Sequence, residues 1–155
     1  MLLEPLKQWY CDECGQVIKS PEEGWIEWRQ DKNKKLFAFR IVHNRLASPL
    51  KPQRNCNHKP DEESSILDSH LDAFLEVAQI ELLNILDPAI SGIDKIKDFH
   101  NFVDVFRRLT LAYYEEARLY WEAATTDGYF SGENETFAYS PYTLKRLIEQ
   151  YGEMD

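Results

Sequence analysis

The sequence predicts an α+β protein in which a small metal-stabilised β module precedes a helical half built from three main helices. Three observations favour this architecture: a Cys-x-x-Cys-Gly motif near the N-terminus, short strand-like segments as far as residue 43, and apolar residues at intervals of three and four after residue 61. A chain of 155 residues can form one domain or two small lobes. We place the division at residue 60, so that residues 1–60 form the β and loop module and residues 61–155 the helical region, and the two parts can pack as one globular unit.

The motif made by Cys11, Cys14 and Gly15 is typical of a metal site. Two cysteines separated by two residues can hold one ion between them, and two thiolates are half of a tetrahedral zinc site. Gly15 can adopt the positive φ that such a tight turn needs. The other half of the site must therefore come from later in the chain.

Candidates for the second pair of ligands lie between residues 43 and 58. On a strand that starts near Lys35, side chains of one parity form an apolar face that ends in a histidine: Phe37, Phe39, Ile41 and His43. Cys56 follows a loop that contains Pro49 and Pro52. The predicted ligands of a structural zinc ion are therefore Cys11, Cys14, His43 and Cys56, with His58 as the alternative histidine.

Residues 9–58 resemble the zinc-knuckle half of zinc-ribbon and rubredoxin-like modules. In those modules Cys-x-x-Cys-Gly lies on a turn between two strands, and here the motif is Cys11, Cys14 and Gly15. The chain departs from that pattern because it has no second Cys-x-x-Cys. The resemblance implies a zinc-binding turn and does not extend to the whole chain.

A disulfide and a redox pair both fit the two cysteines less well than a metal site does. A disulfide between Cys11 and Cys14 would close a very short loop, and three cysteines leave one unpaired. A thioredoxin-type redox pair needs a βαβ context, whereas only ten residues precede Cys11 and Pro21 follows soon after the motif. The remaining alternative is that the thiols are free and that His43 is an ordinary residue at a strand end.

The strand segments expected in the first part are 17–18, 25–28 and 36–42. Trp25 and Trp28 break strict alternation, so one of them is expected near a bulge or a sheet edge. Prolines prevent a continued strand between residues 48 and 60. A module this small has few apolar residues, and a bound zinc ion would stabilise it because metal binding and folding are coupled in such modules.

Helical periodicity begins after residue 61. We expect one helix from about Asp68 to Leu86, a short one at 94–97, and a long one of about 25 residues from Phe99, which would measure about 40 Å. A last helix should cover 142–151, with Ser140 as its N-cap and Pro141 in its first turn.

Two polar pairs on the long helix are further candidates for a site. His100 lies four residues before Asp104, and Glu115 is next to Glu116. The chain has no Glu-x-x-His pair of the kind that di-metal bundles use. We therefore interpret these residues as a polar stripe on a solvated helix, and His70 as a surface or capping histidine.

Charge and composition indicate where the chain acts. The first residues show no basic region followed by an apolar run, and no stretch of about 18 apolar residues occurs, so we expect a cytoplasmic protein without a membrane segment.

Residues 1–60 carry eleven Lys/Arg and seven Asp/Glu, whereas residues 61–155 carry seven and twenty. Between Arg29 and Lys59 nine basic residues accompany one acidic residue, Asp31. This asymmetry favours either an anionic partner or docking of the two halves on each other.

Three functions are compatible with these patterns. The first is a small zinc-binding protein of accessory or regulatory type that binds another protein. The second is a nucleic-acid-binding protein that uses the basic residues and aromatic rings between Arg29 and Lys59. The third, which has less support, is a zinc-dependent hydrolase with Glu13 as its base. The sequence predicts neither the partner nor the oligomeric state.

Overall fold

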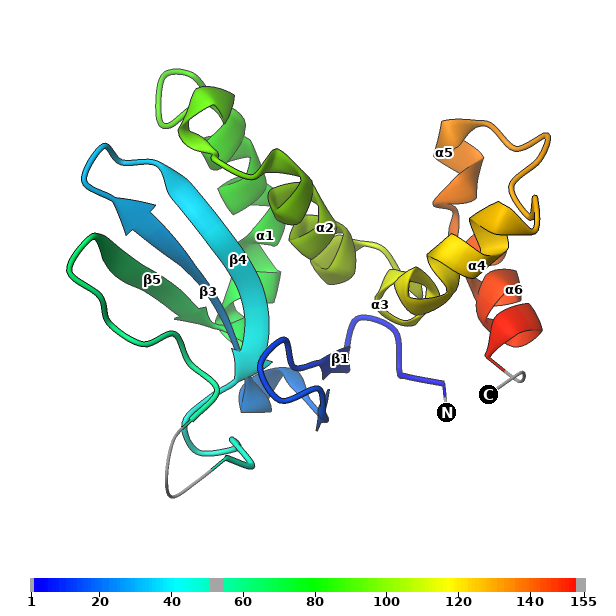
Figure 1. Ribbon diagram of the computed structural model, residues 1–155, viewed down its shortest axis with the longest axis horizontal. Helices are drawn as coiled ribbons and strands as arrows, with labels where there is room; N and C mark the ends of the chain where they lie inside the picture. Colours follow the sequence, from blue (N-terminus) through cyan, green and yellow to red (C-terminus); the bar gives the residue numbers. More distant parts are fainter. Residues whose placement is uncertain (1, 51–54, 153–155) are drawn as a thin grey trace.

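The computed structural model describes residues 2–50 and 55–152, and within these residues the chain has the α+β fold that the sequence predicts. Strand β1 (Trp9–Tyr10) pairs with β2 (Val17–Ile18) in a small antiparallel sheet. Strands β3 (Gly24–Asp31), β4 (Leu36–His43) and β5 (Ser64–His70) form a second antiparallel sheet in the order β4-β3-β5. Figure 1 shows this larger sheet on the left.

The irregularity expected at the two tryptophans is confirmed. The pairing of β3 with β4 shifts register between Glu27 and Arg29, which places Trp28 at the bulge. On the other strand Ala38 has a positive φ of 56°. As a result Trp28 stacks on Phe39 with ring centroids 5.5 Å apart, and Ile41 and His43 remain buried at the end of β4.

Strand β5 is absent from the sequence prediction, which has a helix beginning at Asp68. Residues 64–70 pair with β3 along its whole length, and α1 begins only at Leu71. The segment lacks a clear apolar alternation because it is an edge strand with mostly half-exposed or exposed side chains. The larger sheet therefore joins residues on both sides of residue 60.

The helices follow in the order that Figure 1 shows. Helices α1 (Leu71–Leu86) and α2 (Phe99–Thr110) pack on the sheet, and α6 (Pro141–Tyr151) ends the described chain. Ser140 accepts a hydrogen bond from the N–H of Thr143, so the predicted N-cap is confirmed. The short helices are η1 (Pro21–Glu23), η2 (Ile93–Lys95), α3 (Tyr114–Ala117), η3 (Arg118–Tyr120), α4 (Trp121–Thr126) and α5 (Glu135–Ala138). No helix among the described residues is long and apolar enough to cross a membrane.

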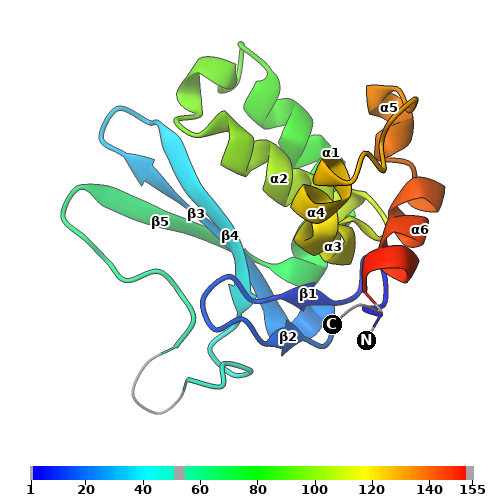
Figure 2. The ribbon, with the colours of Figure 1, turned by 45° about the vertical axis from the view of Figure 1, so that its right-hand side comes forward.

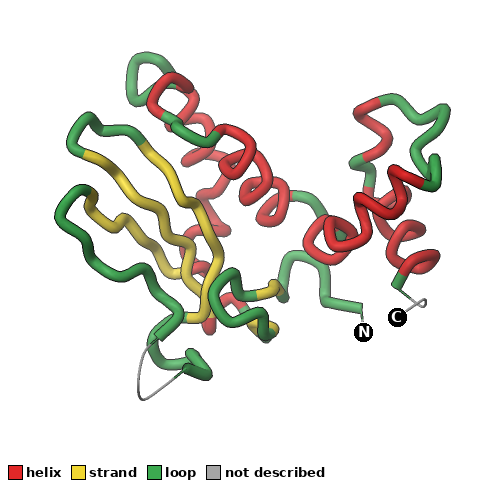
Figure 3. The backbone as a smooth tube through the Cα atoms, viewed as in Figure 1, coloured by secondary structure: helices red, strands yellow, loops and turns green. Residues whose placement is uncertain are grey.

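The prediction of one long helix from Phe99 is wrong. Helix α2 ends at Thr110, and Tyr113 has a left-handed φ of 70°. Figure 3 shows a loop between α2 and α3. An uninterrupted helix would carry Glu115 about 10 Å along the axis from Arg108. The break instead brings the carboxylate of Glu115 to 2.6 Å from the guanidinium of Arg108.

Two hydrophobic clusters form the core. The first, here called the sheet core, extends from Trp9 to Leu109 and contains the buried side chains of the sheet, α1 and α2. The second, here called the helical core, extends from Tyr114 to Tyr151 and lies within the short helices and α6. Figure 2 shows β1 and β2 beneath α2, α3 and α4, close to where both termini lie. The N-terminal hairpin thus belongs to the sheet core through Trp9 and Ile18, and the backbone N–H of Tyr10 contacts α3 through Glu115.

Candidate metal centre

The Cys-x-x-Cys-Gly motif forms a tight turn between β1 and β2, as in the modules that it resembles. Gly15 has φ of +73° and donates its N–H to the carbonyl of Cys11 at 2.9 Å. The N–H of Cys11 in turn bonds the carbonyl of Gln16 at 2.9 Å. A side chain at residue 15 would be strained by this backbone, so the glycine allows the turn that brings Cys11 and Cys14 to one side.

His43 ends β4 and reaches this turn. Its Nδ1 atom lies 3.4 Å from Sγ of Cys14 and 4.0 Å from Sγ of Cys56. Its Nε2 atom lies 3.3 Å from the carbonyl oxygen of Val17 on β2. Because a carbonyl oxygen can only accept, we assign the ring proton to Nε2, which leaves the lone pair of Nδ1 directed at the sulfur atoms. Metal-binding histidines are usually oriented by a bond of this kind.

Cys56 approaches from the loop that follows β4. Its side chain is fully buried, and its Sγ lies 3.2 Å from the hydroxyl of Ser48, which is itself buried. Burial, together with the neighbouring thiols, raises the pKa of Cys56 to about 12, and burial also raises the pKa of Cys14. A divalent cation would reverse this effect because it stabilises thiolates. Ser48 is a contact that the sequence reasoning missed, since no pattern marks a serine as a neighbour of a distant sulfur.

The four groups converge on one point. One ligand atom from each residue lies within 4.8 Å of all the others, and this set is Cys11, Cys14, His43 and Cys56. In a tetrahedral zinc site the bond lengths place neighbouring ligand atoms about 3.4–3.8 Å apart. Three of the four residues are buried, and Cys14 is partly buried. The described residues therefore contain a Cys3His group that can hold one metal ion.

The structure leaves the alternative histidine outside this group. The Nε2 atom of His58 lies 3.1 Å from the carbonyl of Ala38, and its backbone N–H bonds the carboxylate of Glu27 at 2.8 Å. The side chain of Glu13 pairs with Arg40 at 2.9 Å. His58 thus belongs to a polar cluster on β3 and β4. This cluster lies next to Cys56.

A buried carboxylate in that cluster was also missed. Glu27 is fully buried, and Arg40 donates to it at 2.7 Å. The same arginine donates to the carbonyl of Cys56 at 3.0 Å and thereby fixes the backbone next to the thiol. Glu27 lies among Trp25, Ile26 and Trp28 in the sequence, and a charge in such an apolar segment is the signal that could have revealed it.

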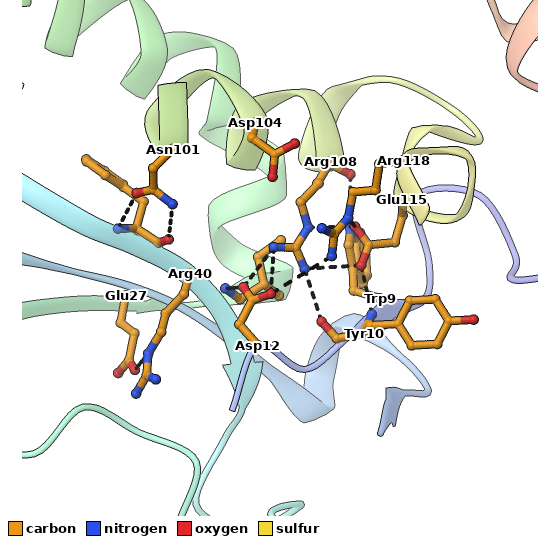
Figure 4. Close-up of polar contacts among 12 residues, drawn as sticks. Trp9, Tyr10, Asp12, Glu27, Arg40, Asn101, Asp104, Arg108, Glu115 and Arg118 are labelled. Atoms are coloured by element: carbon orange, nitrogen blue, oxygen red, sulfur yellow. Dashed lines mark hydrogen bonds and ion pairs between the residues drawn. The ribbon is translucent and has the colours of Figure 1, made fainter. Parts of the chain in front are cut away.

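A second ionic group connects the metal-site turn to the helices, and we call Asp12, Arg108 and Glu115 the Arg108 cluster (Figure 4). Arg108 donates to both carboxylate oxygens of Asp12, at 2.9 and 2.7 Å, and to the carbonyl of Tyr10. Burial disfavours the charge, but Glu115 and Asp12 outweigh it and raise the pKa of Arg108 above its ordinary value. Asp12 lies between the cysteines of the motif, so this cluster joins the turn directly to α2 and α3.

The prediction that Glu115 and Glu116 belong to a solvated stripe is wrong. Their exposed fractions are 5% and 4%, and Glu116 accepts the backbone N–H of Leu3 at 2.6 Å. The break at Tyr113 turns both carboxylates inward. Asp104 accepts the hydroxyl of Tyr114 at 2.7 Å, whereas His100 is exposed.

Of the basic residues between Arg29 and Lys59 that the structure describes, Arg29, Lys35 and Arg40 make internal contacts, whereas Lys32, Lys34, Arg45 and Lys59 are exposed. Arg29 pairs with Asp61 at 2.6 Å, and Trp28 and Phe39 stack within the sheet core. Lys51 and Arg54 lie outside the described residues, as does Pro52 of the expected loop.

Comparisons with known proteins give no relative to which these groups can be matched. No family model matches the chain, and neither the curated proteins nor the solved structures include a significant match.

Proposed function

We propose that this chain is a small cytoplasmic accessory or regulatory protein that binds a structural zinc ion through Cys11, Cys14, His43 and Cys56 and acts by binding another protein. The observation that carries the proposal is the convergence of three sulfur atoms and the Nδ1 atom of His43 within 4.8 Å. A complete set of four protein ligands is typical of structural zinc, because catalytic zinc keeps one position for water or substrate. Sulfur-rich ligation favours zinc among the common divalent metals.

The position of the site supports a structural role. The turn that carries Cys11 and Cys14 also carries Asp12, which binds Arg108 between the two cores. A metal ion at this turn would therefore fix both β4 and the start of the helical half. Its chemical contribution is to stabilise thiolates at a place where burial otherwise favours the neutral thiols.

Cobalt substitution tests the metal part of the proposal. We expect the cobalt-loaded protein to show the strong visible absorption of a tetrahedral site with thiolate ligands and no exchangeable water. The Cys56→Ser variant should lose intensity because one thiolate is replaced, whereas His58→Ala should leave the spectrum unchanged. A six-coordinate spectrum, or an identical spectrum for Cys56→Ser, would contradict the ligand set.

Binding to nucleic acid is the second function, and the internal use of two of its arginines and two of its aromatic rings weakens it. Arg29 and Arg40 are paired with carboxylates, and Trp28 and Phe39 are in the core. A salt titration of binding to mixed RNA and DNA separates the two functions, because phosphate contacts strengthen as salt is diluted. Retention at low salt that falls steeply with added salt would favour nucleic acid over a protein partner.

A further inference from the structure

An apolar groove lies on the surface formed by α1 and α2. One hollow of about 280 Å³ is lined mainly by apolar side chains, among them Leu82, Leu86, Phe99, Val103 and Phe106. A second hollow of about 470 Å³ continues along α1 past Leu75, Gln79 and Ile80. Thr110 lines both hollows, so the two are adjacent, and we refer to them together as the groove. Two of its side chains are large and apolar yet well exposed: Phe99 at 42% and Ile80 at 58%.

The length of the groove matches a short helix. It extends along α1 from Leu75 to Leu86, which corresponds to about 16 Å at the rise of an α-helix. About three turns of a partner helix would cover that length. Such a helix would present apolar residues at i, i+3 or i+4, and i+7, as helices that bind in grooves do.

The charge of the residues around the groove indicates whether its partner is positively or negatively charged. Residues 61–94 contain nine carboxylates and no Lys or Arg. Glu76 lines the groove, Glu81 lies on the same helix, and neither makes an ion pair within the part of the chain that the structure describes.

The nearby cations are already engaged. The guanidinium of Arg107, which lines the first hollow, lies 4.0 Å from the ring centroid of Tyr139, and Lys97 pairs with Asp31. The groove is thus apolar at its floor, with the carboxylate of Glu76 on its α1 side and the guanidinium of Arg107, which lies against Tyr139, on its α2 side.

We infer that this groove binds a cationic amphipathic helix of another protein. The inference rests on the proposed function and names the class of partner for it. A second copy of this chain would oppose one acidic α1 surface to another, and like charges across an interface are unfavourable. A cationic helix instead buries its apolar face against Phe99 and Val103 and places a basic residue beside Glu76.

Selection from a displayed library of random 16-residue peptides tests this inference with the full chain in its metal-loaded form. Peptides are first removed on the double variant Phe99→Ser/Val103→Gln, which has the same net charge as the wild type. This step discards peptides that only adhere to an acidic protein. We expect the enriched peptides to be net positive and to show helical spacing of apolar residues.

Matched variants then separate the apolar and the electrostatic contributions. Phe99→Ser should weaken an enriched peptide about tenfold or more, whereas Tyr142→Ser, which alters an exposed ring on α6, should change affinity less than about twofold. Glu76→Gln should weaken it more than Glu122→Gln, which removes the same charge from an exposed position on α4.

Enriched peptides that are neutral or acidic, no enrichment at all, or equal losses for the groove and control variants would overturn the inference. Self-association that Phe99→Ser abolishes would assign the groove to a second copy and would also overturn it. Metal content measured on the same samples keeps the two proposals apart, because a metal-free protein that still selects cationic helices contradicts only the zinc site.

Discussion

The sheet core and the helical core are stabilised in different ways. The first encloses two buried cysteines together with buried polar groups, among them Glu27, His43 and Ser48. The second is built largely from aromatic rings, and Trp121 lies 4.9 Å from Tyr139 and 4.4 Å from Phe130 between ring centroids. Buried polar groups are costly unless each has a partner, whereas packed rings are stabilised by their large apolar area. The sheet core should therefore depend on a bound ion, and the helical core should not.

Removal of a thiolate should have the largest effect, because it should unfold the sheet core and leave the helical core folded. Cys14→Ser should lose the metal and unfold the sheet, because a structural zinc contributes about 10–16 kcal/mol and a whole domain is stable by only about 5–15 kcal/mol. Helices α3–α6 should remain folded. Far-ultraviolet circular dichroism measures the loss of strand and the retention of helix, and a variant that keeps both sheet and metal would contradict the expected difference between the cores.

The two histidines of the sheet should differ in their effect on the metal. His43→Ala removes a proposed ligand. Loss of a residue that only hydrogen-bonds a ligand reduces metal affinity about 10–100-fold, so the loss of His43 should reduce it by more. His58→Ala should leave affinity nearly unchanged, because that ring bonds the carbonyl of Ala38 instead. Competition with a coloured chelator measures both. Equal affinities for the two variants would remove His43 from the ligand set.

The Arg108 cluster tests how the two cores are joined. Arg108→Met leaves Asp12 and Glu115 without their buried cation, and this should reduce the free energy of unfolding by about 3–5 kcal/mol. Arg108→Met/Glu115→Met should recover part of the loss because it removes a buried charge as well. Urea denaturation measures both variants. A loss below about 1 kcal/mol for Arg108→Met would show that the cores do not depend on this cluster.

Asp31 gives the smallest effect and a dependence on pH. The hydrogen bond from Lys97, followed by that from the backbone of Lys35, lowers the pKa of Asp31 from 3.8 to about 2. The folded state therefore favours the ionised form, and the stabilisation is present above about pH 4 and lost as the pH falls through 2. Thermal unfolding should show Asp31→Asn to be less stable than the wild type, and by the same amount at pH 5 and pH 7, because the carboxylate is ionised in both the folded and the unfolded state throughout that range.

The same thermal measurement on Lys97→Met/Asp31→Asn provides the control. Once Lys97 is replaced, the Asp31→Asn change should lose most of its effect at pH 5. An effect of Asp31→Asn that is the same with Lys97 present and with Lys97 replaced would contradict this assignment.

The local parts of this structure could be predicted from the sequence. Cys-x-x-Cys-Gly spacing indicated the turn, and the parity of β4 placed His43 at the end of its apolar face, where the structure brings it to Cys14 and Cys56. The cap of α6 followed from Ser140 and Pro141. Binding of a metal by this group stays a prediction.

The parts that were missed depend on contacts between distant residues. Strand β5 forms because β3 offers a free edge, and its own sequence has little strand character. The helix breaks at Tyr113, and this break brings Glu115 into contact with Arg108. The helical periodicity of the sequence continues through that position, where no glycine or proline indicates a break. The apolar neighbours of Glu27 in the sequence indicate that it is buried, but its pairing with Arg40 depends on the register of β3 and β4.

Native mass spectrometry of the untagged protein measures whether the four ligands hold an ion and whether folding depends on it. Each folded chain should carry one zinc ion, and the ion should be lost together with the compact charge states on acidification. A compact chain without metal, whose three thiols all react freely, would contradict the conclusion that these four ligands bind an ion on which the sheet core depends.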